Sequence, residues 1–300
     1  MDDIKRLNTE QNNENSWNID LCTTKEILTI INEEDKLVAL AVEKCKNEIA
    51  AIVNYAVDGI QQGGRVIYVG AGTSGRLGIL DASECPPTYG VSYETVQGII
   101  AGGREAMIKA KEGSEDSFDL GMKDMKQLAL NDADVVIGLA ASGRTPYVLG
   151  ALTSAKKAGC HTGSISCVKH AKLSEIADVS IEVITGAEVI CGSTRMKAGT
   201  AQKMILNMIS TATMIQLGKV FHNIMVDFQP TNEKLIQRAK HMIKQCIGCS
   251  IEEADDWYNE SDGNVKIAIA MAKSRKSKLE CNTAMIKSKG NLRKALKLLS

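Results

Sequence analysis

Short runs of apolar residues alternate along the chain with segments in which apolar residues recur at helical spacing. The strand-like runs fall at residues 65–70, 95–101, 133–140, 161–168 and 179–184. Helical patterns lie between most of them, at residues 75–82, 114–130, 146–158 and 171–176. Strand, glycine-rich loop, helix and strand in succession is typical of an α/β fold. The pattern predicts a doubly wound parallel sheet with helices on both faces.

Helical patterns continue on both sides of this region. Residues 24–62 are predicted to be helical, and a long helix is expected from Thr194 to Leu217. Residues 246–300 show three short amphipathic stretches, with breaks expected at Asp255–Asp256 and at Ser261–Gly263.

The chain is therefore expected to contain two domains. Residues 1–245 would form the sheet domain with an N-terminal helical arm, and residues 246–300 a small all-helical domain. The polar residues 1–20 are expected to be mobile or to become ordered on assembly.

Composition limits the classes of partner. The 300 residues are 44% hydrophobic, enough for a sizeable core, and 36 basic residues balance 36 acidic ones. Nucleic-acid binders usually carry a basic excess on one face, so no nucleic-acid partner is expected. The N-terminus lacks the apolar core of a secretory signal, and no apolar run reaches the ~20 residues that span a bilayer. We expect a cytoplasmic protein that makes no membrane contact.

The cysteines indicate reduced thiols. Nine cysteines are scattered along the chain, which is usual in a reducing compartment. Cys246 and Cys249 form one CxxC pair, but a zinc site needs a second pair of ligands and none of suitable spacing follows. No metal is expected.

The first glycine-rich loop, Gly70–Gly75, follows a predicted strand. Its sequence matches the GxGxxG dinucleotide pattern, and Glu94 follows at about the distance of a ribose-binding acid, yet just before a strand. Thr73 and Ser74, with Gly72, also place hydroxyls and free amides at a helix start, which suits a phosphate or a sugar hydroxyl. A nicotinamide site and a capped turn without a ligand remain alternatives.

The second loop repeats the design. Ser142, Gly143, Arg144 and Thr145 follow another predicted strand and precede Pro146, which suits the first turn of a helix. Helix capping alone would explain either loop. Ligands of doubly wound sheets bind at the carboxyl ends of the strands, so two such loops together favour a phosphosugar.

A third polar segment spans residues 192–200. Ser193 or Thr194 would cap the long helix in the simplest interpretation. Lys197 near a helix start is electrostatically unfavourable, and an anionic ligand would relieve that conflict. Ser193, Lys197 and the nearby Glu188 are therefore candidate binding residues.

Two acids are candidate catalytic groups. Glu84 is expected at the end of the helix that follows the first loop, where the helix dipole disfavours the ionised carboxylate. Glu115 is expected at a helix start, where the dipole favours it. An acid and a base whose pKa values are shifted in opposite directions in this way are typical of one catalytic site. A surface position for Glu84 and a capping position for Glu115 are the simpler alternatives.

The run from Gly70 to Pro87 resembles that of the N-acetylmuramic acid 6-phosphate etherases. The residues around Glu115, Ala140–Tyr147 and Gly192–Thr200 also resemble that family, so the similarity covers essentially the whole chain. It implies the sugar isomerase (SIS) fold and release of D-lactate from the substrate by elimination followed by hydration, without a cofactor. It further implies that Glu84 is the acid and Glu115 the base, and it adds Ser83 to the expected binding residues.

The resemblance also implies a homodimer whose site borrows residues across the interface. A phosphosugar sensor of the glucokinase regulatory type is the main alternative, but those proteins are longer and carry two such domains. A phosphosugar isomerase would need the base but no acid at C3. The sequence departs from the pattern of many SIS proteins at Ala140, where they carry a serine. The phosphate contacts are therefore expected to be shared differently, with the Thr73–Ser74 loop or Lys197.

Overall fold

The computed structural model describes residues 8–109, 111–228, 230 and 232–300. Contacts within the chain define two compact units. Unit 1 comprises Met1–Ser83 and Tyr93–Ser210, and unit 2 comprises Glu84–Ser92 and Thr211–Ser300.

Unit 1 is built around a parallel sheet of five strands in the order β2-β1-β3-β4-β5. All five strands fall within the predicted runs, at β1 (Val66–Gly70), β2 (Val96–Ile100), β3 (Val135–Leu139), β4 (His161–Ser166) and β5 (Val179–Glu182). The central strands β1 and β3 are buried at every residue because helices cover both faces. The structure therefore confirms the predicted doubly wound fold.

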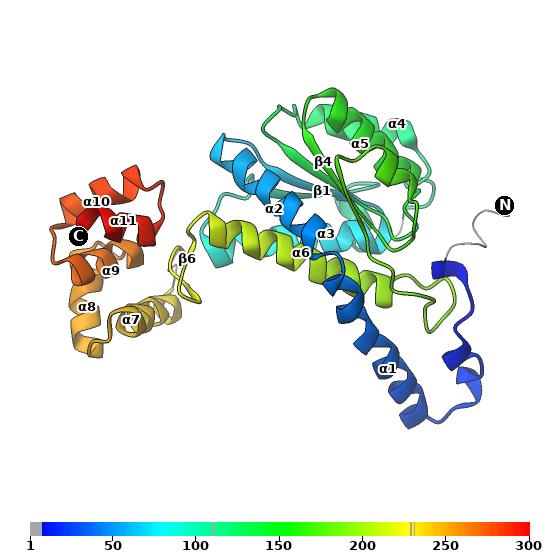
Figure 1. Cartoon of the computed structure of the whole chain (residues 1–300), viewed down its shortest axis with the longest axis horizontal. Helices are drawn as coiled ribbons and strands as arrows, with labels where there is room; N and C mark the ends of the chain where they lie inside the picture. The colour runs from blue at the N-terminus through cyan, green and yellow to red at the C-terminus, as the bar shows by residue number, and fades with distance from the viewer. Residues whose placement is uncertain (1–7, 110, 229, 231) are drawn as a thin grey trace. The chain divides into compact units, whose positions relative to one another are not determined.

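The helices of unit 1 form a layer on each face of the sheet (Figure 1). Helices α4 (Phe118–Gln127) and α5 (Pro146–Lys157) cover one face, and α2 (Lys46–Gln61) and α3 (Gly72–Tyr89) lie on the other. Helix α4 packs closely on α5: a Cβ at Gly150 would lie 2.0 Å from the carbonyl oxygen of Phe118. That contact fixes the segments that precede both helices, and both segments carry candidate site residues.

Three predicted helix boundaries were wrong. Helix α3 continues through Pro86 and Pro87 to Tyr89. Prolines usually end helices, but here the amide of Gly90 still donates to the Pro86 carbonyl at 2.9 Å. Helix α4 begins at Phe118 rather than Ser114, because the Ser117 side chain caps it. Residues 172–175 form only a 3-10 turn.

The described part of the N-terminal arm packs on unit 1. Residues 8–21 form three 3-10 turns, and Ser16 Oγ donates to the carbonyl oxygen of Val189 at 2.7 Å. Asn13 Nδ2 donates to the carbonyl oxygen of Ala187 at 3.2 Å. These contacts contradict the expectation of a mobile arm for residues 8–21, and ordering on assembly stays a prediction. Residues 1–7 of the expected arm lie outside the described part of the chain.

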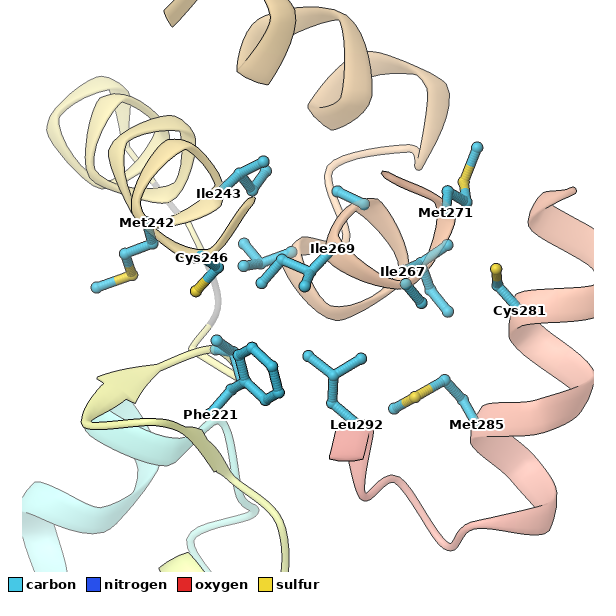
Figure 2. Close-up of a cluster of buried hydrophobic side chains, with 14 of the residues drawn as sticks. Phe221, Met242, Ile243, Cys246, Ile267, Ile269, Met271, Cys281, Met285 and Leu292 are labelled. Atoms are coloured by element: carbon cyan, nitrogen blue, oxygen red, sulfur yellow. The ribbon is translucent and has the colours of Figure 1, made fainter. Parts of the chain in front are cut away.

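Unit 2 combines a short hairpin with a bundle of helices. The hairpin is β6 (Val220–Phe221) with β7 (Ile224–Met225). The helices are α7 (Glu233–Ile247), α8 (Ile251–Glu260), α9 (Val265–Ser274), α10 (Lys278–Lys287) and α11 (Leu292–Leu299). In Figure 2, Phe221, Ile243, Ile269 and Leu292 point into one shared apolar core.

The predicted division of this tail was only partly right. The break at Ser261–Gly263 is confirmed by a turn with Gly263 at φ 76°. Helix α8 runs through Asp255–Asp256 without a break, because Ser250 caps its start and Asp255 pairs with Lys240 at 2.7 Å. The expected division after residue 245 falls within α7, and as a statement about domains it stays a prediction.

A buried ion pair joins α1 (Thr24–Glu43) to the start of α6 (Lys197–Gln216). Lys197 Nζ lies 2.5 Å from Glu34 Oε2, and both side chains are buried. Burial acts to raise the pKa of Glu34, but hydrogen bonds from Asn15 and Lys197 outweigh it and leave the pKa below its ordinary value. Glu34 lies on the apolar stripe of α1, four residues before the buried Val38.

We predict that Lys197→Met destabilises the fold by about 3–5 kcal/mol, because Glu34 is left buried without its cation. The double variant Glu34→Leu/Lys197→Met removes both charges and should recover most of that loss. Urea unfolding of the three proteins measures the difference. Because the pKa of Glu34 is lowered, the pair stabilises at neutral pH and that contribution is lost as pH falls through the folded-state pKa. A single variant as stable as the double one would contradict this assignment.

Candidate active site

The carboxyl ends of β1 and β3 open on the same cavity. Gly70 pairs with Leu139 in the parallel ladder, so the loops that follow the two strands leave the sheet side by side. A cavity of about 520 Å³ lies there within unit 1. Gly72 lines it, together with the polar residues Glu10, Thr73, Ser74, Glu115, Asp116, Ser142, Arg144, Thr145 and Thr194. The two loops that the sequence singled out therefore share one cavity, and Glu115 lines it with them.

The first loop presents the N-terminus of α3 to this cavity. Gly72 begins the helix with φ +51°, and the first amides of a helix have no carbonyl acceptor within it. Ser74 is buried, and its Oγ donates to Gln202 Oε1 on α6 at 2.9 Å. Ser74 therefore ties the loop to α6, while Thr73 contributes the more accessible hydroxyl.

The second loop presents Ser142 and Thr145. Gly143 has φ +65°, and a Cβ there would lie 2.4 Å from the Cβ of Ala171, so the turn requires glycine. Thr145 is the N-cap residue of α5, yet its side chain makes no capping hydrogen bond. Its hydroxyl is therefore available to a ligand in the cavity.

Neither candidate acid lies at a helix terminus. Glu115 is an exposed residue in a turn before α4, and its backbone carbonyl accepts from the Tyr147 amide at 3.0 Å. Glu84 is exposed within α3, which ends only at Tyr89. Helix-dipole effects fall off within the terminal turn, so the electrostatic argument made from the sequence was wrong for both acids.

Glu188 and Lys197 do not line the cavity but hold the start of α6. The Glu188 carboxylate is fully buried and accepts from the amides of Lys197 at 2.8 Å and Ala198 at 2.9 Å. Burial raises the pKa of Glu188, although the two amides and the Lys197 charge act in the opposite direction. The anion that balances Lys197 is thus Glu34, which the sequence analysis missed, and its position within an apolar stripe was the available signal.

The remaining predicted residues lie elsewhere or are replaced by neighbours. Ser83 is exposed, donates to the Leu80 carbonyl at 2.8 Å, and lines a separate groove of about 760 Å³ beside β2. Ser193 is half-buried, and its neighbour Thr194 lines the cavity instead. Glu10 also lines the cavity, and no motif in the sequence marks it, because it belongs to the arm.

Within the described ranges, no group of three or more His, Cys, Asp or Glu side chains is arranged to hold a metal ion. Cys246 is buried in the core of unit 2, and burial raises the pKa of its thiol. No helix among the described residues is long and apolar enough to cross a membrane.

Comparison with curated proteins finds close full-length relatives. The chain is 56% identical over 294 residues to an N-acetylmuramic acid 6-phosphate etherase of Clostridium botulinum, with 98% of each chain covered. It is 54% identical over 293 residues to the protein of the same name from a Geobacillus species, covering 98% of this chain and 99% of the relative.

Two further comparisons match part of the chain. Residues 48–156 match the family model described as the glucokinase regulatory protein N-terminal SIS domain. A solved phosphoheptose isomerase from Francisella tularensis is 16% identical, with a TM-score of 0.49 over 65% of this chain and 100% of that one. The sheet has the SIS arrangement, and the identity to relatives extends over almost the whole chain. The chain therefore belongs to the N-acetylmuramic acid 6-phosphate etherase family.

Proposed function

We propose that the chain is a carbon–oxygen lyase that cleaves the lactyl ether of N-acetylmuramic acid 6-phosphate to N-acetylglucosamine 6-phosphate and D-lactate. The observation that carries the proposal is the cavity in which two hydroxyl-bearing loops meet Glu115. The names of relatives more than half identical to this chain support the choice of substrate.

The chemistry is an elimination followed by a hydration. Opening of the sugar ring exposes an aldehyde at C1, which acidifies the proton on C2. Glu115 removes that proton as general base, the bond from C3 to the ether oxygen breaks, and Glu84 protonates the departing lactate. Water then adds across the C2–C3 double bond and restores a hydroxyl at C3. No oxidant or reductant enters, and a nucleotide or metal is not required.

The phosphate is assigned to the two loops at the strand ends. Thr73, Ser142 and Thr145 contribute hydroxyls, and the start of α3 contributes backbone amides and the positive end of its dipole. Gly72, Gly143 and Arg144 shape the loops around the phosphate. Three further residues would support the site without contacting the substrate. The polar atoms of Ser74, Glu188 and Lys197 hold α6 and the loops in place.

We predict that Ser142→Ala and Thr145→Ala each weaken phosphosugar binding by about 1.5–3 kcal/mol, the worth of a hydrogen bond to a charged group. Titration calorimetry with N-acetylglucosamine 6-phosphate measures the loss. Thr153→Ala is the matched control, because its hydroxyl also lies on α5 but donates to the Leu149 carbonyl. The unphosphorylated sugar should bind all four proteins equally badly. Unchanged affinity in Thr145→Ala would mean that the phosphate binds elsewhere.

The division of labour between the acids can be tested in heavy water. We predict that Glu84→Gln releases almost no lactate yet still exchanges the C2 proton, because deprotonation precedes departure of the leaving group. Glu115→Gln should do neither. Each loss should reach or exceed the ~10²–10⁴-fold that general acid–base assistance contributes. Proton NMR of the substrate follows both events, and the exposed Glu105→Gln serves as control. Exchange by Glu115→Gln but not by Glu84→Gln would reverse the roles, and wild-type lactate release by both would remove both residues from catalysis.

The active form is proposed to be a cytoplasmic homodimer. Helix α1 exposes Leu28, Leu37 and Leu40 at 60%, 48% and 57%, a surface suited to a second copy of the chain. Glu84 also stands about three helical turns after Gly72 within α3, too far along one helix to act on a ligand at its own start. A partner chain would then supply Glu84 to a site that contains Glu115 of the first.

Mixed dimers test this arrangement. We predict that Glu84→Gln and Glu115→Gln chains, each inactive alone, regain about a quarter of wild-type activity when mixed and allowed to exchange subunits. Half of the dimers are then hybrids, and in each hybrid one of two symmetric sites has both acids. Lactate release is the measurement, and a mixture of Glu84→Gln with itself is the control. If the mixture stays inactive although hybrids form, both acids act from the same chain.

A further inference from the structure

The segment that carries Glu115 has little regular structure of its own. Residues 101–117 join β2 to α4, and the described part contains one 3-10 turn, η4 (Arg104–Met107). Gly102, Gly103 and Gly113 all have positive φ angles there, at 88°, 74° and 74°. Glycines lose more conformational freedom on folding than other residues do. A segment of this kind needs contacts from the rest of the protein to keep one conformation.

Arg76 on the second turn of α3 makes such contacts. Its Nε donates to the carbonyl oxygen of Met107 at 2.9 Å, and its Nη2 donates to that of Ala106 at 2.8 Å. The guanidinium is planar and its donors have a fixed fork geometry. Hydrogen bonds to two neighbouring carbonyls therefore fix the guanidinium and the two peptide groups relative to one another. Ala106 lies in the 3-10 turn η4, and its side chain is buried.

The two ends of the segment are held by backbone hydrogen bonds. At one end the Ala101 amide donates to Gly70 at 3.0 Å, and at the other the Tyr147 amide donates to Glu115 at 3.0 Å. Between Arg76 and Glu115 lies a cavity of about 140 Å³ that both residues line. Glu115 lines this cavity and the larger one, so a shift of the middle of the segment would alter where its carboxylate lies.

We propose that Arg76 is a positioning residue that holds the segment before α4 and thereby sets the placement of Glu115. An arginine one residue after a phosphate-binding glycine loop would ordinarily be assigned to the phosphate. Here two of its donors are used by backbone carbonyls, so it acts on the protein rather than on the ligand. The catalytic consequence rests on the proposed function of Glu115, but the structural consequence does not.

The structural test is hydrogen–deuterium exchange of the unliganded protein, followed by mass spectrometry. In Arg76→Ala, amides of residues 101–116 should exchange faster, while peptides from β3 and α5 should not change. Arg104→Ala is the matched control, because this arginine lies in the same segment with its side chain exposed. Unchanged exchange in Arg76→Ala would overturn the proposal, whether or not the chain cleaves the ether. Arg76→Lys keeps the positive charge but loses the paired donors of the guanidinium. If the alanine variant does not fold, the lysine variant should show the same faster exchange.

The catalytic test separates positioning from binding. Arg76→Ala and Arg76→Lys should lower kcat by ~10²-fold, as expected for a displaced catalytic group, with KM for the phosphosugar nearly unchanged. Added guanidinium should restore part of kcat in Arg76→Ala and none in Arg76→Lys. A large rise in KM with kcat preserved would instead make Arg76 a substrate ligand and overturn the proposal. Faster exchange in a chain that releases no lactate even as wild type would retain the positioning role and reject only the proposed function.

Discussion

The in-register pairing of β1 with β3 is the constraint on which the candidate site depends. Because Gly70 is paired with Leu139, the two loops that follow these strands begin at the same level of the sheet. Both strands are buried on both faces, so a one-residue slip in register would turn every side chain to the opposite face and disrupt its packing against the helices. Helices α3 and α5 then start beside one another, and their first residues form one cavity of hydroxyls and amides.

Buried charges support this cavity without entering it. Glu188 satisfies the amides at the start of α6, and Glu34 neutralises Lys197 in the same region. Glu34 and Lys197 are both buried, so removing either one leaves the other as an isolated buried charge. Thr194, three residues before Lys197, lines the cavity wall together with the arm residue Glu10. The contacts that hold the start of α6 therefore lie next to the site in the sequence.

The sequence predicted those features that local pattern determines. Apolar runs located all five strands of the parallel sheet, and glycines with hydroxyls located both loops of the cavity. It failed where contacts between distant residues decide the outcome. The pairing of Glu34 with Lys197 and the entry of Glu10 into the cavity both join residues far apart in the chain. The prolines in α3 misled as well, because the helix continues through them to Tyr89, where local rules would end it.

If this cavity performs an elimination and then a hydration, isotopes from the solvent must enter the products at defined positions. The wild-type protein would be given N-acetylmuramic acid 6-phosphate in deuterated water enriched in ¹⁸O, and both products analysed by mass spectrometry. Our account predicts N-acetylglucosamine 6-phosphate with solvent deuterium at C2 and solvent ¹⁸O at C3, together with D-lactate whose ether oxygen is unlabelled. Solvent ¹⁸O in that position of lactate, or cleavage without deuterium at C2, would contradict it.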